Sequence, residues 1–168
     1  MMGWKQLTAS RSTGAALAVC EMVAIYGLSH RSWKCVGPGF SNGLTNFCHF
    51  PLYAILGALL AVALGIGLGE ARSARSAWGG AAIAVIYGVF DEWHQGTVPG
   101  RDCSLFDVVT NAVSAGCGTA ALRALLYQSL TRAVWWLLIG SGLALASSFI
   151  LPESFPHVNL LLHRAFFG

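Results

Sequence analysis

Five long apolar stretches constrain the fold of this chain more than any other feature of its sequence. The clearest runs from Ala133 to Leu151 without a charged residue. A helix needs roughly 20 mainly apolar residues to cross the hydrocarbon core of a bilayer. The chain is 55% hydrophobic and only 10% charged, whereas a soluble domain carries about 25% charged residues. The sequence therefore predicts an all-α, polytopic integral membrane bundle of about five transmembrane helices.

Turn-forming and polar residues separate these stretches. Glycine and proline punctuate residues 30–44, and Pro99-Gly100 interrupts residues 96–104, as is typical of loops. Residues 70–76 form a short polar link. The helices are accordingly expected at residues 14–29, 45–69, 77–93, 105–127 and 133–151.

We expect three units along the chain. Residues 1–13 would be a cytoplasmic N-terminus, residues 14–127 a four-helix membrane domain, and residues 128–168 an additional helix with a short tail. A signal peptide is the alternative for the first apolar stretch, because a basic start followed by an apolar run fits both. Glu21 interrupts that run and no small-residue cleavage site follows it, so we retain it as a spanning helix.

Basic residues in the links set the expected orientation, because Lys and Arg concentrate in cytoplasmic loops. With the N-terminus inside, the inner links collect Lys5, Arg11, Arg72, Arg75, Arg123 and Arg132. The outer links and the tail hold Arg31, Lys34, Arg101 and Arg164. This bias places the start of the second helix, the end of the third and the start of the fourth at the outer face.

The five cysteines lack the CxxC spacing of metal centres. Cys20 and Cys117 fall within apolar stretches, where we expect small buried side chains. Cys35, Cys48 and Cys103 fall in or near the outer links, so a disulfide among them is an option if that side is oxidising.

The stretch from Phe90 to Asn111 is unusually polar for a junction between two apolar helices. Residues four apart share a helix face. Three helices each present such a polar pair here: His49 with Tyr53, Asp91 with Gln95, and Asp107 with Asn111. An ionisable side chain inside a bilayer costs about 2.5–3.5 kcal/mol unless it faces the bundle interior and finds a partner. We therefore expect one polar pocket, open to the outer face.

Such a pocket suits acid–base chemistry and anion binding. The candidate catalytic residues are Asp91, Glu92 and His94, as general acid and base. The expected ligand-binding set is His49, Tyr53, Gln95, Arg101, Asp107 and Asn111. Within it, Arg101 lies on the turn at the pocket mouth and is suited to hold a phosphate or carboxylate bidentately. A metal site of Glu, His and Asp is conceivable, but the spacing matches no standard metal motif, so we predict none and name no cofactor.

Several of these residues also have a simpler explanation. His49 and Tyr53 fit the headgroup level as interfacial side chains. Asp107 is suited to cap the N-terminus of the fourth helix, and Arg101 can be a solvated charge on a link. Asn111 lies one turn deeper, where an unpaired amide is costly, which favours a role in a hydrogen-bonded network.

The polar stretch resembles the signature of the VanZ-like membrane protein family. The resemblance is carried by Asp91-Glu92-x-His94-Gln95, Pro99-Gly100-Arg101, Ser104-x-x-Asp107-x-x-x-Asn111 and Gly116-x-Gly118, together with His49, Tyr53 and Leu28-Ser29. It covers about residues 14–127. One departure is Asn46, at a position where members of the family often carry Lys. If that Lys contributes to anion binding, this chain has lost part of the site.

The resemblance implies a multi-pass protein of the bacterial inner (cytoplasmic) membrane. The family is named for a protein linked to resistance to the glycopeptide teicoplanin, and its biochemical activity is not settled. We expect this chain to bind an anionic lipid headgroup or a lipid-linked cell-envelope intermediate, with membrane lipid as its partner. Chemical modification of that ligand is a further option.

The alternative is a structural accessory subunit of a larger membrane protein complex, in which the polar residues serve helix packing. An open, wet pocket would favour ligand binding, whereas a closed and mutually satisfied network would favour the structural role. The net charge of +3 forms no basic run, so no nucleic-acid partner is expected.

Overall fold

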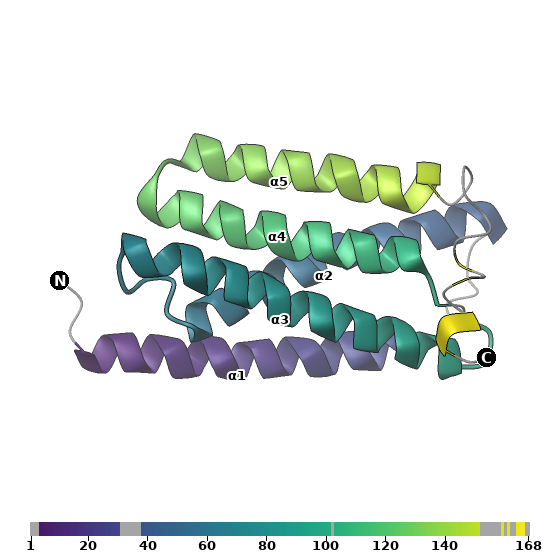
Figure 1. Cartoon of the computed structure of the whole chain (residues 1–168), viewed down its shortest axis with the longest axis horizontal. Helices are drawn as coiled ribbons and strands as arrows, with labels where there is room; N and C mark the ends of the chain where they lie inside the picture. The colour runs from purple at the N-terminus through teal and green to yellow at the C-terminus, as the bar shows by residue number, and fades with distance from the viewer. Residues whose placement is uncertain are drawn as a thin grey trace.

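The computed structural model is a bundle of helices that run alongside one another, and it describes residues 4–30, 38–101, 103–151, 159, 161 and 164–166 (Figure 1). The long helices are α1 (Trp4–Ser29), α2 (Pro38–Ala63), α3 (Glu70–Thr97), α4 (Leu105–Tyr127) and α5 (Leu130–Leu145). α5 continues into a π-helical turn, η1 (Ala146–Ile150). No strand occurs among the described residues, so the predicted all-α bundle is confirmed.

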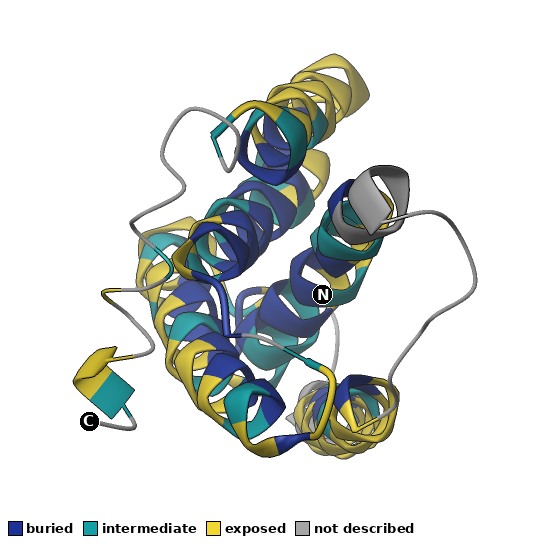
Figure 2. Cartoon of the chain, turned by 90° about the vertical axis from the view of Figure 1, so that its right-hand side faces the viewer, coloured by how far each residue is buried: buried dark blue, intermediate teal, exposed yellow. Residues whose placement is uncertain are grey.

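Four segments of the described chain are long and apolar enough to cross a membrane. They are Ser10–Ser29, Gly43–Ala63, Leu105–Tyr127 and Leu130–Ile150. Buried residues face the bundle axis, whereas α1 and α5 turn exposed residues outward (Figure 2). The exposed side chains include Val19, Val23, Trp135 and Leu138, as expected where a helix faces lipid. These features indicate a membrane protein.

α3 lies among these four segments but is not itself apolar enough to count as one of them. It carries Glu70, Arg72 and Arg75 in its first turns and Asp91 and Glu92 near its other end. Its sides contact α2 and α4 closely, and Asp91 and Glu92 are buried. α3 is therefore the polar member of the bundle.

The link between α2 and α3 differs from the prediction. We expected the second helix to end at Gly69, followed by a polar link over residues 70–76, but α2 ends at Ala63 and α3 begins at Glu70. The turn between them is held by Gly65 and Gly69, whose φ angles of +89° and +118° suit glycine alone. Residues 70–76 are helical because Glu70 lies in the first turn, where a carboxylate is favourable.

The helices also begin earlier than the apolar pattern indicated. α2 begins at Pro38 rather than at residue 45, α1 at Trp4 rather than at residue 14, and α5 at Leu130 rather than at residue 133. Proline is well suited to a first helical position because its missing N–H has no intrahelical partner there. Hydropathy marks where a helix enters lipid, not where its hydrogen bonding begins. α4 has the predicted bounds.

Small residues allow α2, α3 and α4 to approach closely. A Cβ placed on Gly118 of α4 would collide with the backbone of Ala54 on α2, and a Cβ on Gly80 of α3 would lie 2.6 Å from the backbone N of Ala61. Such contacts are typical of helices packed in lipid. Gly118 and Gly80 thus lie at close helix–helix contacts, whereas Gly116 has no neighbour within 4 Å of such a Cβ.

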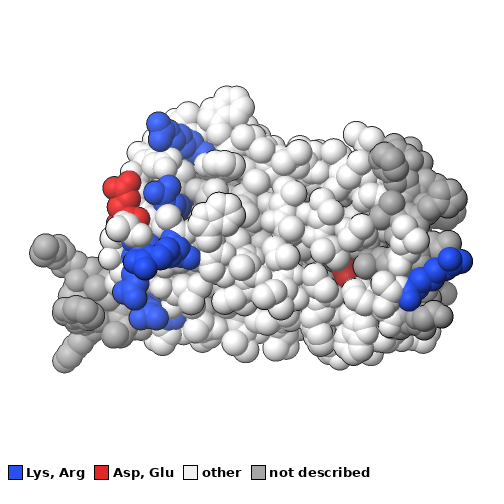
Figure 3. Space-filling view, viewed as in Figure 1, with Lys and Arg blue, Asp and Glu red and all other residues white. Residues whose placement is uncertain are grey.

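Basic side chains gather at the end of the bundle where α1 begins (Figure 3). This end holds the links from α2 to α3 and from α4 to α5, and Arg123 donates there to Ser73 while Arg11 donates to the carbonyl of Ala63. Arg11, Arg72, Arg75, Arg123 and Arg132 of the inner set expected from the sequence are thus together at one end. That this end faces the cytoplasm stays a prediction.

Candidate functional site

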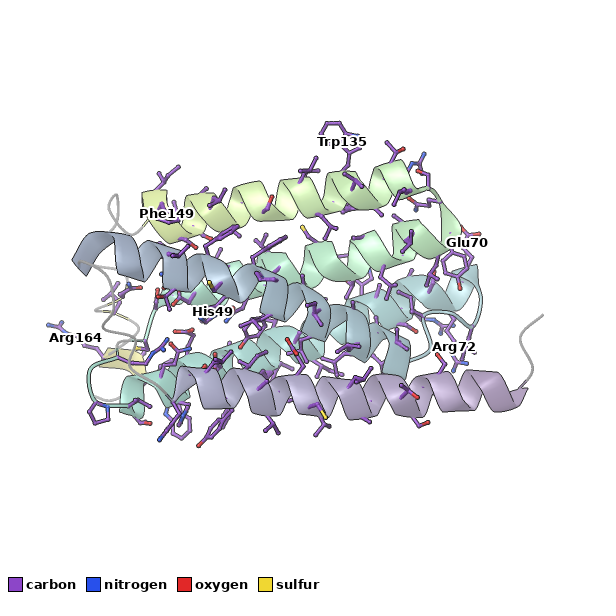
Figure 4. The ribbon with its side chains drawn as sticks, turned by 180° about the vertical axis from the view of Figure 1, so that it is seen from behind. His49, Glu70, Arg72, Trp135, Phe149 and Arg164 are labelled. Carbon is purple, nitrogen blue, oxygen red and sulfur yellow. The ribbon has the colours of Figure 1, made fainter. Side chains whose placement is uncertain are left out.

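The polar pairs of α2, α3 and α4 meet inside the bundle, away from the basic end. His49 lies toward the other end of the bundle, whereas Glu70 and Arg72 lie at the basic end (Figure 4). We call the side chains that meet here the acidic cluster: His49, Tyr53, Asp91, Glu92, Gln95, Asp107 and Asn111. All seven are buried. The structure therefore brings together every predicted site residue except His94 and Arg101, which lie beside the cluster.

Hydrogen bonds within the cluster join α2 to α3. The Tyr53 hydroxyl donates to Asp91 Oδ2 at 3.2 Å. The Gln95 amide donates to the same oxygen at 3.0 Å and to Glu92 Oε1 at 3.3 Å. One amide group thus holds the two neighbouring carboxylates in place.

A second set of contacts joins α2 to α4. His49 Nδ1 lies 2.9 Å from Asn111 Oδ1, and the His49 ring stacks with that of Tyr53. Asn111 fits because Gly88 of α3 has no side chain, and a Cβ there would lie 3.0 Å from both Cβ and Nδ2 of Asn111. The predicted network role of Asn111 agrees with this contact.

The turn between α3 and α4 contributes two contacts to the cluster, through Arg101 and Ser104. The Arg101 guanidinium donates to Gln95 Oε1 at 2.5 Å, and the backbone N–H of Ser104 donates to Glu92 Oε2 at 3.0 Å. Ser104 also caps α4, because its hydroxyl accepts from the Asp107 N–H at 3.3 Å. Asp107 is therefore not the N-cap, and its carboxylate is turned into the bundle. Arg101 is half-buried rather than fully solvated.

His94 lies on a different side of α3 from the one we expected. Its ring stacks on Tyr26 of α1 with the ring centroids 4.3 Å apart, and on His30 at 5.5 Å. Its Nε2 is buried without a hydrogen-bond partner. Two residues turn an α-helix by about 200°, so His94 lies nearly opposite Glu92 on α3, on the side that contacts Tyr26 of α1. It is therefore set apart from the acid–base set predicted with Asp91 and Glu92.

The acidic cluster is closed but incompletely paired. We expected an open pocket, but all seven side chains are buried, and a cavity of about 270 Å³ lies instead at the basic end, against Leu64 and Arg72. Three polar atoms of the cluster are buried without partners: Asp91 Oδ1, Asp107 Oδ1 and Asn111 Nδ2. Three carboxylates face one guanidinium, so the site carries a formal charge of −2 when all four groups are ionised.

Three members of the cluster are arranged as metal ligands could be. His49, Asp91 and Glu92 each offer one ligand atom, and the three atoms lie within 4.8 Å of one another. Sequence spacing did not reveal this set, because His49 comes from α2 and the carboxylates from α3. Sequence reasoning also missed Ser29, whose hydroxyl accepts from the Gln95 amide at 3.4 Å. The Ser104-x-x-Asp107 spacing is the signal that would have identified the α4 cap.

The cysteine predictions have mixed outcomes. Cys117 is buried as expected, but Cys20 is exposed because it lies on the outer face of α1. Cys48 is an exposed free thiol and Cys103 is buried. Cys35 lies outside the described residues, so a disulfide that involves it stays a prediction.

Together, these features define an α-helical membrane bundle with a buried, net-acidic polar cluster near one end. Comparison with protein-family models, with curated proteins and with solved structures found no match to this chain. The VanZ-like resemblance therefore depends on the motif residues themselves, several of which meet in the cluster.

Proposed function

We propose that this chain is a VanZ-like protein of the bacterial inner membrane that binds an anionic lipid headgroup, or a lipid-linked cell-envelope intermediate, at the Arg101 end of the bundle. The observation that supports this most directly is the position of Arg101. Its guanidinium is held against Gln95 on the turn that covers the cluster, while part of the side chain stays exposed. A guanidinium in this setting can bind a phosphate through two N–H groups.

The same geometry favours binding over catalysis. Asp91 and Glu92 already accept hydrogen bonds from Tyr53, Gln95 and Ser104, and they are buried. A general acid or base must come within hydrogen-bond reach of the proton it transfers. Proton transfer by these carboxylates would require the ligand to pass Arg101 and displace part of the network.

A structural accessory subunit is the second candidate, and one observation favours it. Hydrogen bonds in and around the cluster link Ser29 of α1, Tyr53 of α2, Gln95 of α3 and Asn111 of α4. Polar contacts between helices stabilise membrane bundles by about 0.6–2 kcal/mol each. A cluster of this kind would fix the register of four helices even without a ligand.

Mass spectrometry of the lipids that co-purify with the protein tests the lipid proposal. Arg101→Lys keeps the charge but loses the bidentate fork. Arg132→Ala removes an exposed charge at the basic end, where the Arg132 guanidinium donates to Gln128 Oε1 at 3.3 Å. We expect one anionic lipid to be enriched in the native protein and in Arg132→Ala, and reduced in Arg101→Lys.

The result that would contradict the proposal is a lipid profile equal to that of the bulk membrane in all three folded proteins. Co-purification of a stoichiometric protein partner, together with that profile, would support the accessory-subunit function instead.

A further inference from the structure

The most unusual feature of the acidic cluster is the convergence of an imidazole and two carboxylates from different helices. His49 is 6% exposed, Asp91 1% and Glu92 0%, and their ligand atoms lie within 4.8 Å of one another. Ionised carboxylates this deeply buried are normally paired with a cation, because burial without compensation is costly. Carboxylates that merely pack at a protein surface would not converge on a buried imidazole.

One carboxylate oxygen in this set has no protein partner. Asp91 Oδ2 accepts from Tyr53 and Gln95, but Asp91 Oδ1 is buried without a hydrogen bond. Asp107 adds further negative charge, since it interacts electrostatically with both His49 and Asp91. Arg101 interacts electrostatically with both Glu92 and Asp107, so one guanidinium is shared by more than one carboxylate. The protein atoms thus leave Asp91 Oδ1 without a partner, in a site that holds three carboxylates and one guanidinium.

The hydrogen bonds of His49 prepare its other nitrogen to bind a cation. Asn111 Oδ1 can only accept, so the His49 Nδ1 that faces it at 2.9 Å carries the proton. In the neutral imidazole the lone pair then lies on Nε2. Metal-binding histidines are held in this way, with one ring N–H donated to an oxygen and the other nitrogen on the ion.

The carboxylates are supported in a similar manner. The Ser104 N–H fixes Glu92 Oε2, and the Gln95 amide bridges Glu92 Oε1 and Asp91 Oδ2. Each carboxylate oxygen has two lone pairs, so these contacts leave acceptor capacity for an ion. The surroundings therefore resemble an outer shell that positions ligands.

We propose that His49 Nε2, Asp91 and Glu92 bind a divalent transition-metal ion such as Zn²⁺ or Mn²⁺. Mixed imidazole and carboxylate ligands suit these ions better than Ca²⁺ or Mg²⁺, which prefer oxygen alone. Zinc ligands lie about 2.0–2.2 Å from the ion, so two of them are at most about 4.4 Å apart. The present spacing, within 4.8 Å, is close to this limit. A site with three protein ligands keeps a position for water or a ligand atom.

This inference goes beyond lipid binding and does not depend on it. The ion would offset the negative charge of the cluster, which by itself repels an anionic headgroup. The site would bind its ion whether or not a lipid phosphate reaches it. The two proposals can therefore fail separately.

Titration with Co²⁺ tests the site directly, because bound Co²⁺ absorbs visible light. The full chain is purified in detergent without a polyhistidine tag, stripped with a chelator, and titrated in the absence of added lipid. We expect one Co²⁺ per chain, displaced by Zn²⁺ or Mn²⁺. Asp91→Asn and Glu92→Gln should abolish this binding, and Asn111→Ala should weaken it about 10–100-fold, as loss of an outer-shell partner does.

Glu70→Gln is the matched control, because it removes an exposed carboxylate at the other end of α3. It should bind Co²⁺ as the native protein does. Circular dichroism establishes folding for each variant, and His49→Gln replaces Glu92→Gln in the test if the latter does not fold. Absence of stoichiometric Co²⁺ in the native protein, or equal binding by folded Asp91→Asn, would overturn the inference.

Discussion

The contact between Gly118 and Ala54 gives the sharpest test of how α2 and α4 pack. In Gly118→Ala, the new Cβ would lie 2.6 Å from Ala54 Cα and 2.7 Å from the Ala54 carbonyl carbon. These are backbone atoms, so no side-chain rotation relieves the collision. Overpacking of this kind costs about 1–3 kcal/mol, and the helix propensity of alanine returns about 0.5–1 kcal/mol. We expect a net loss of roughly 1–2 kcal/mol in the free energy of unfolding.

Gly116→Ala is the control for that prediction, because the same substitution two residues earlier meets no atom within 4 Å. It should leave stability unchanged or raise it by up to about 1 kcal/mol. Equilibrium unfolding in mixed micelles, followed by circular dichroism, measures both variants against the native protein. If Gly118→Ala is as stable as Gly116→Ala, then α2 and α4 do not pack in this register.

Two further predictions concern hydrogen bonds at the ends of helices. Ser104→Ala removes the hydroxyl that accepts from the Asp107 N–H and caps α4, and should lower the free energy of unfolding by about 1 kcal/mol. Ser104→Asp retains an acceptor and should lower it less in the same unfolding assay. Tyr127→Phe removes a hydroxyl that donates to Ile66 O at 2.8 Å and accepts from Gly69 N at 3.2 Å; we expect a loss of about 1–2 kcal/mol and faster amide exchange at Gly69, and unchanged exchange there would contradict the contact.

The sequence was sufficient to predict the helical bundle because hydropathy and charge act over whole segments. The stretch from residue 105 to 127 shows this, since its predicted and observed bounds agree. Hydropathy did not locate the polar starts of α1 and α3. There, the outcome depends on local signals such as Glu70 in a first turn and the φ angles of Gly65 and Gly69.

The candidate site was predictable in its membership but not in its geometry. The four-residue spacing correctly predicted that Asp91 and Gln95 lie on one side of α3, since both belong to the cluster. It could not show that His94 turns toward Tyr26, because that depends on where α1 lies. Nor could it bring His49 within reach of Glu92, because the distance between them depends on how α2 packs against α3.

The polar character of α3 has a consequence for how the chain enters the membrane. A helix that carries Asp91 and Glu92 in its last turns has little tendency to leave the translocon for lipid alone, since each such charge costs up to about 2.5–3.5 kcal/mol. Its partners for those groups are Tyr53, already synthesised, and the Ser104 N–H, which follows it. We therefore expect the integration of α3 to depend on its neighbours, with α2, α3 and α4 entering the membrane together.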